Sequence, residues 1–132
     1  MHGLHLTADL HDCRCDARWL VDAPALGTLC LEAVAGSGLQ AVGQLFHTFP
    51  ATARGPGGVT ATLLLAESHL CVHTWPELRG ATMDVYVCNV SGDHSAAAHA
   101  LMSRLVAHFD PARVERHAMA RSTVNEAVLS AS

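Results

Sequence analysis

The stretch LLLAESHLCVHTWPE, residues 63–77, carries more reactive side chains than a buried strand requires. An apolar run ends at Ser68, and His73 and Trp75 follow within the next seven residues. Cys88 stands twenty residues after Ser68. A hydroxyl, an imidazole and a thiol are groups that serve enzymes as nucleophiles, bases and acids. We therefore expect this part of the chain to carry the chemistry.

The absence of one residue type narrows that chemistry, because the sequence contains no lysine. A pyridoxal phosphate enzyme holds its cofactor through a lysine amine, so this class is excluded. The ten histidines are scattered without an HExxH pattern, and Cys13 and Cys15 are too close together for the usual metal knuckle. We expect no metal site.

The composition also limits the partners and the location of the protein. Hydrophobic residues make up 50% of the chain and charged residues 15%, and the formal net charge is -4, so there is no basic surface for nucleic acid. No segment has the pattern of a secretory signal or the length of a membrane span. Five cysteines without paired spacing are typical of reduced intracellular thiols. We expect a cytoplasmic protein that binds neither nucleic acid nor membrane.

Hydrophobic periodicity predicts six strands and two helices within one domain of 132 residues. The strands are expected at residues 4–11, 39–49, 59–66, 70–75, 81–88 and 113–120. One helix follows Asp22 and ends near Gly36, and the other follows Asp93 and ends before Asp110. This order predicts an α+β two-layer sandwich, with the two helices on one face of a largely antiparallel sheet. The other sheet face is either solvated or packed on a second copy.

Side chains alternate between the two faces of a strand, which predicts where the reactive groups point. The strands at 70–75 and 81–88 each have one apolar face and one reactive face. The reactive faces carry Cys71, His73, Trp75, Asp84, Tyr86 and Cys88. Ser68 does not share the parity of His73, so these two side chains meet only if the chain turns or bulges near His69.

Two motifs, AESHLCVHTWPEL and the following MDVYVC, resemble the processing and active-site region of the bacterial and archaeal S-adenosylmethionine decarboxylases. The likeness extends over most of the chain, including the segments HLTADLHDC, HTFP and GGVT. The core motif is specific, because a Glu-Ser bond, HxxxHTWPE and a cysteine twenty residues after the serine are hard to reach by chance.

The resemblance implies that the chain is a proenzyme that cuts itself between Glu67 and Ser68, giving a beta chain 1–67 and an alpha chain 68–132. The Ser68 hydroxyl would attack the Glu67 carbonyl, and His73 would then remove the α-proton. Elimination would leave a pyruvoyl group, derived from Ser68, as the covalent cofactor. Such a ketone forms a Schiff base with a substrate amine, which fits the missing lysine. Cys88 matches the proton donor of decarboxylation.

The resemblance also implies roles in recognition and processing for other residues. Phe49 and Trp75 match aromatic residues that sandwich the substrate adenine, and Glu67 is expected at both the processing site and the substrate site. Thr60 matches a hydroxyl residue of the processing site, and Asp9 falls where glutamate is common. The family packs two processed protomers, so we expect a homodimer that covers the spare sheet face.

Three departures from the family pattern affect substrate recognition rather than self-processing. The first strand carries Asp9, Leu10 and His11 in place of an acidic, aliphatic, aromatic run. The loop between Phe49 and Val59 is longer than usual, and Gly80 stands where tyrosine is common.

The expected function is decarboxylation of S-adenosylmethionine, which supplies the aminopropyl donor for spermidine synthesis. One alternative is a homologue that decarboxylates arginine or ornithine. The other is an unprocessed, non-enzymatic paralogue that binds a metabolite or an active partner subunit.

Overall fold

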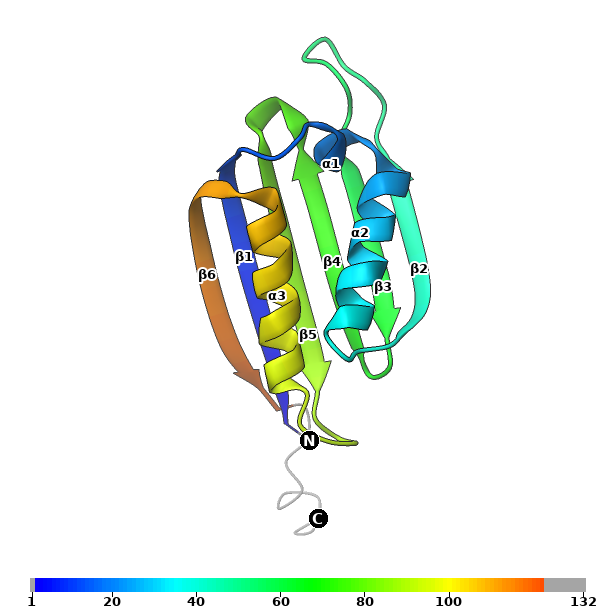
Figure 1. Cartoon of the computed structure of the whole chain (residues 1–132), viewed down its shortest axis with the longest axis vertical. Coiled ribbons are helices and arrows are strands. Elements are labelled where there is room, and N and C mark those ends of the chain that lie inside the picture. The colour runs from blue at the N-terminus through cyan, green and yellow to red at the C-terminus, as the bar shows by residue number, and fades with distance from the viewer. Residues whose placement is uncertain (1, 123–132) are drawn as a thin grey trace.

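The computed structural model describes residues 2–122, which form a six-stranded sheet with two long helices on one face (Figure 1). In chain order the elements are β1 (Gly3–Cys13), α1 (Arg18–Val21), α2 (Ala23–Gly36), β2 (Ala41–Thr48), β3 (Val59–Leu65), β4 (Ser68–Trp75), a 3-10 turn (Pro76–Leu78), β5 (Gly80–Cys88), α3 (Ser95–Phe109) and β6 (Pro111–Arg121). The α+β sandwich predicted from the sequence is confirmed. The four-residue α1 and the 3-10 turn were not predicted from the sequence.

The sheet has the strand order β2-β3-β4-β5-β1-β6, and every neighbouring pair is antiparallel. β3, β4 and β5 are neighbours both in sequence and in the sheet, whereas β1 lies between β5 and β6. Both long helices pack on one sheet face (Figure 1). We call the opposite face, which carries Thr60, His73, Asp84, His5 and Asp9, the open face.

Helix α2 begins and packs as its sequence predicts. The Asp22 carboxylate accepts a hydrogen bond from the Ala25 amide at 3.1 Å, and a proline occupies the first turn. The helix packs on β2 and β3. A Cβ on Gly27 would lie 2.7 Å from the Phe46 ring, so glycine permits this close approach. Within residues 2–122, none of the helices is long and apolar enough to cross a membrane.

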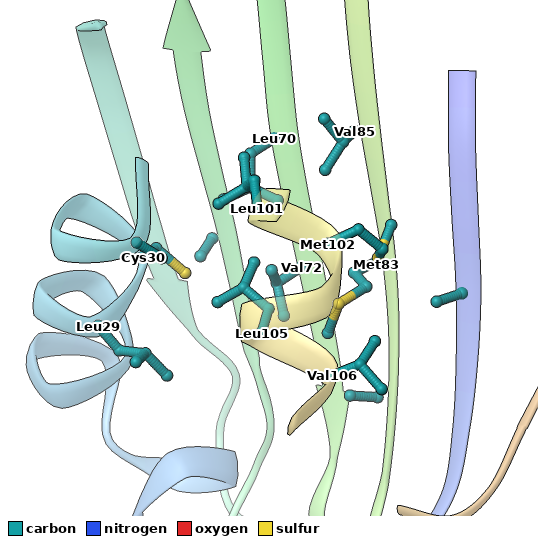
Figure 2. Packing of buried hydrophobic residues seen from close by; sticks show 14 of the residues in the cluster. Leu29, Cys30, Leu70, Val72, Met83, Val85, Leu101, Met102, Leu105 and Val106 are labelled. Atoms are coloured by element: carbon teal, nitrogen blue, oxygen red, sulfur yellow. The ribbon is translucent and has the colours of Figure 1, made fainter. Parts of the chain in front are cut away.

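Helix α3 packs an apolar stripe into the core. Leu101, Met102, Leu105 and Val106 point toward side chains of β4 and β5 (Figure 2). Each buried leucine of this kind stabilises the fold by about 1.5–3 kcal/mol. The helix ends at Asp110, which has a left-handed backbone with φ of 49°.

Thr74 is the buried polar residue that ties the sheet to the helix layer. Its hydroxyl donates to the Leu20 carbonyl at 2.7 Å and accepts from the Val59 amide at 2.8 Å. Its exposed fraction is 5%. One side chain therefore joins β3, β4 and the short helix α1 immediately below the open-face residue His73.

We expect Thr74→Val to lower the free energy of unfolding by about 1–3 kcal/mol, because it leaves a buried amide and a buried carbonyl without partners. Thr74→Ser keeps the hydroxyl and should retain most of the stability. Both variants are measured by urea unfolding at fixed protein concentration in a Ser68→Ala background, so that every chain stays continuous. Equal midpoints for the valine and serine variants would contradict this role.

Candidate active site

The Glu67–Ser68 bond lies at the turn that joins β3 to β4. Leu65 pairs with Ser68, so Ala66 and Glu67 form a two-residue tip. Glu67 has a left-handed backbone with φ of 62°, a conformation that costs a non-glycine residue about 1–2 kcal/mol. Ser68 Oγ is buried and finds no hydrogen-bond partner in the described part of the chain. A buried, unpaired hydroxyl beside a strained turn is a candidate nucleophile.

The structure does not bring Ser68 and His73 of one chain together. β4 pairs with β3 and β5 in unbroken register, without the bulge that could have joined them. Five residues of extended strand separate the two Cα atoms by about 16 Å. The turn after β3 lies at the lower end of the sheet in Figure 1, and the loop before β3 lies at the upper end. His73 is near this upper end.

Cys88 ends β5 at the same end of the sheet as Ser68, but the two side chains belong to different faces. Ser68 alternates with His69 and so shares the helix-covered face with Leu70. Cys88 alternates into the open face with Asp84, and its exposed fraction is 8%. Residue 68 must therefore turn toward the open face before it can work beside Cys88.

His73 has a hydroxyl partner at the other end of the sheet. Thr60 Oγ1 and His73 Nδ1 are 2.9 Å apart. Thr60, His73, Thr82 and Asp9 pair in one row across four strands, and His73 and Asp9 line a shallow hollow of about 310 Å³. If His73 takes up a proton through Nε2, its Nδ1 must carry hydrogen and donate it to Thr60. The threonine can thus fix the tautomer that a base needs.

Phe49 and Trp75 line a pocket of about 600 Å³ at the same end as His73. Their side chains are available to a ligand, with exposed fractions of 49% and 40%. Glu77 and Arg54 also line this pocket, and neither was predicted from the sequence as a site residue. Glu77 had a signal in the TWPE run, whereas Arg54 comes from a loop whose side chains follow no periodicity.

Asp84 binds two histidines in the middle of the open face. Its Oδ2 lies 2.7 Å from His69 Nε2 and 2.9 Å from His5 Nε2. These three residues could also be considered as metal ligands, because their ligand atoms lie within 4.8 Å of one another. Arg121 Nη1 is 3.1 Å from His5 Nδ1, and because a guanidinium only donates, His5 carries its proton on Nε2. Both short contacts are hydrogen bonds to the carboxylate.

The remaining cysteines are poor thiolate nucleophiles. Burial raises the pKa of Cys13 to about 11 and that of Cys30 to about 12. Burial also raises the pKa of Cys15 and Cys71. These four side chains therefore stay protonated at neutral pH.

Three comparisons identify what the chain is similar to. The family model described as S-adenosylmethionine decarboxylase matches residues 4–122. The S-adenosylmethionine decarboxylase proenzyme of Aquifex aeolicus is 36% identical over 124 residues, which cover 94% of this chain and 84% of the relative. The proenzyme of Pyrobaculum aerophilum is 40% identical over 116 residues, with coverages of 86% and 82%. The crystal structure of the adenosylmethionine decarboxylase from Aquifex aeolicus superposes with a TM-score of 0.79 at 32% identity and covers 94% of this chain and 93% of that one.

The fold and these matches define a carboxy-lyase that is made as a proenzyme. The chain belongs to the S-adenosylmethionine decarboxylase family, which confirms the resemblance and the activity expected from the sequence. The family uses a pyruvoyl group made from serine. The unpaired Ser68 hydroxyl fits that group, because it is a serine oxygen next to a peptide carbonyl with no other task in the described structure.

We expect Thr60→Val to slow self-cleavage by roughly three- to tenfold, because His73 then loses the hydrogen bond that orients it. Thr60→Ser restores the hydroxyl and should mature at nearly the wild-type rate. The rate is read from the fraction of full-length chain by intact mass at successive times after synthesis. Wild-type maturation of the valine variant would mean that His73 needs no orienting partner.

Proposed function

We propose that this S-adenosylmethionine decarboxylase cuts itself between Glu67 and Ser68 and uses residue 68 as its reactive end. The observation that carries the proposal is the buried, unpaired Ser68 hydroxyl beside the left-handed Glu67. Oγ of Ser68 attacks the Glu67 carbonyl carbon, and the acyl group moves from nitrogen to oxygen. A base then removes the α-proton of residue 68, and the Glu67 carboxylate leaves. Uptake of water and release of ammonia complete the new chain end.

The base in this reaction is the partner's His73, supplied by a second copy of the chain. Within one chain His73 is too far from Ser68, by the strand geometry described above. Two copies can pack with their open faces together, about a two-fold axis that lies between the sheets and perpendicular to the strands. This arrangement would bring the His73 end of each copy onto the Ser68 end of the other. The large exposed apolar side chains Leu45, Leu64 and Met119 support this contact, because strand pairing puts all three on the open face. The mature enzyme is therefore a homodimer of cut protomers.

Each site of the dimer combines two functional halves. The first half contains residue 68, with Cys88 as the acid that returns a proton to the substrate carbon after carbon dioxide leaves. The second half contains Phe49 and Trp75, whose ring faces bind the adenine. The pyruvoyl group supplies a ketone that reacts with the substrate amine and an adjacent amide carbonyl that accepts the electrons of the broken bond. Glu77 is placed in the pocket to accept hydrogen bonds from ribose hydroxyls.

The two aspartates of the open face are poorly placed to bind the distal cation of arginine or ornithine. A basic amino acid needs a free carboxylate for its distal cation, but Asp84 already accepts hydrogen bonds from two histidines. Asp9 lines the shallow hollow rather than the aromatic pocket.

The free thiols support a cytoplasmic location for the mature enzyme. All five cysteines lie within the described residues, and none forms a disulfide. Free thiols of this kind are typical of reducing compartments.

We expect the purified protein to consist of two fragments, 1–67 and 68–132, while Ser68→Ala and His73→Ala each remain full length. Co-expression of these two variants tests the shared site. In a mixed dimer the Ser68→Ala chain supplies the histidine, so the His73→Ala chain should be cut. Intact mass with differently tagged chains measures this.

Two results contradict the proposal in different ways. A wild type that never cuts would favour the unprocessed paralogue. A His73→Ala chain that stays whole in every mixed dimer would return the base to its own chain.

We expect carbon dioxide release from S-adenosylmethionine and not from arginine or ornithine when each is offered separately to the cut enzyme.

Trp75→Ala should raise KM for S-adenosylmethionine by roughly tenfold, because a stacked aromatic is worth about 1 kcal/mol beyond its buried area. Leu78→Ala is the matched control, since it removes an exposed apolar side chain just outside this pocket. Release from arginine or ornithine alone would overturn the substrate and leave the cleavage mechanism in place.

A further inference from the structure

Asp84, His69 and His5 form a cluster, the Asp84 cluster, which adjoins residue 68 and has no task in the reaction described so far. Asp84 of β5 accepts hydrogen bonds from His69 of β4 and His5 of β1, so one carboxylate ties three neighbouring strands together. The contacts are 2.7 and 2.9 Å, and the side chains of all three residues are between 21% and 35% exposed. Hydrogen bonds to a partly buried carboxylate are stronger than neutral ones.

The His69 ring is held on a second side by aromatic packing. Tyr86 stacks on His69 with ring centroids 5.7 Å apart and an interplanar angle of 29°. The same tyrosine meets His5 edge to face at 5.8 Å. Arg121 covers Tyr86 at 5.8 Å and donates to His5. The imidazole of His69 is therefore fixed both in its plane, by Asp84, and on its face, by Tyr86.

The fixation of His69 becomes more important after the cut. In the continuous chain residue 68 is held from both sides, by the Glu67 turn and by His69. Once the Glu67–Ser68 bond is gone, residue 68 is a chain end, and its one covalent tether is the peptide bond to His69. The carbonyl of that peptide is the group that must accept electrons from the substrate. Any motion of His69 therefore displaces the reacting atoms of residue 68.

We propose that Asp84 is a positioning residue for the cut enzyme, which holds His69 so that the new chain end at residue 68 stays aligned with Cys88. The inference rests on the proposed cleavage between Glu67 and Ser68. Residue 68 starts on the helix-covered side and must rotate to the open face, and His69 is the fixed point of that rotation. The hydrogen bond between Asp84 and His69 thus matters for turnover far more than for the formation of the hairpin.

The test compares Asp84→Asn with wild type in the cut enzyme. An asparagine at this site loses the charge that strengthens both hydrogen bonds, so we expect cutting to go to completion but kcat to fall by roughly 10- to 100-fold with little change in KM. His69→Ala should lose as much. His69→Gln keeps a donor near the Nε2 position and should lose less. His99→Gln, which changes an exposed histidine of helix α3 on the other side of the sheet, is the matched control and should behave as wild type.

A second measurement does not depend on activity. Deuterium exchange at the amides of residues 69–72 should be faster in Asp84→Asn than in wild type when both are cut. The difference should nearly vanish when both carry Ser68→Ala, because the continuous hairpin then holds His69 from both sides. A merely structural role would raise exchange equally in the two forms.

Each other outcome has a definite meaning. Wild-type kcat in a fully cut Asp84→Asn enzyme overturns the proposal, and so does an Asp84→Asn chain that is never cut. Loss of wild-type activity on dialysis against a chelator, with recovery on adding zinc, would make the three residues a metal site and also overturn it. An uncut, inactive wild type would instead reject the proposed cleavage itself.

Discussion

The positions of the reactive groups depend on the unbroken antiparallel register of β3, β4 and β5. A slip of one residue would exchange the faces of a strand and send His73 into the core. The buried side chains Leu63, Leu70 and Val85 oppose such a slip, because each would lose its apolar surroundings. The same core that stabilises the fold therefore sets the distance between the two halves of the site.

Local periodicity was enough to predict most of this sheet and the faces of its central strands. Leu70 and Val72 are buried and His73 is on the open face, as alternation requires. Alternation also predicted that Ser68 and His73 of one chain come together only if the strand turns or bulges between them. The strand is regular, so the two side chains stay apart. The proposed homodimer would overcome this separation by bringing His73 of one copy to Ser68 of the other.

Other parts of the site could not be read from the sequence for physical reasons. His5 and Asp84 are 79 residues apart, and their contact depends on the register of β1 against β5, which no local pattern encodes. Arg54 belongs to a loop, where side-chain directions do not alternate. The short α1 is only four residues long, too short for its apolar spacing to be recognised.

The left-handed backbone of Glu67 gives the proposed maturation a direction. In the intact hairpin this residue is kept at φ 62° by the pairing on both sides of the turn. As a free carboxyl end it can relax to an ordinary conformation, and it would have to regain the strained one before any ligation. The loss of ammonia removes the amine that ligation would need. An opened turn therefore has neither the geometry nor the chemical group to close again, and each molecule passes from precursor to enzyme only once.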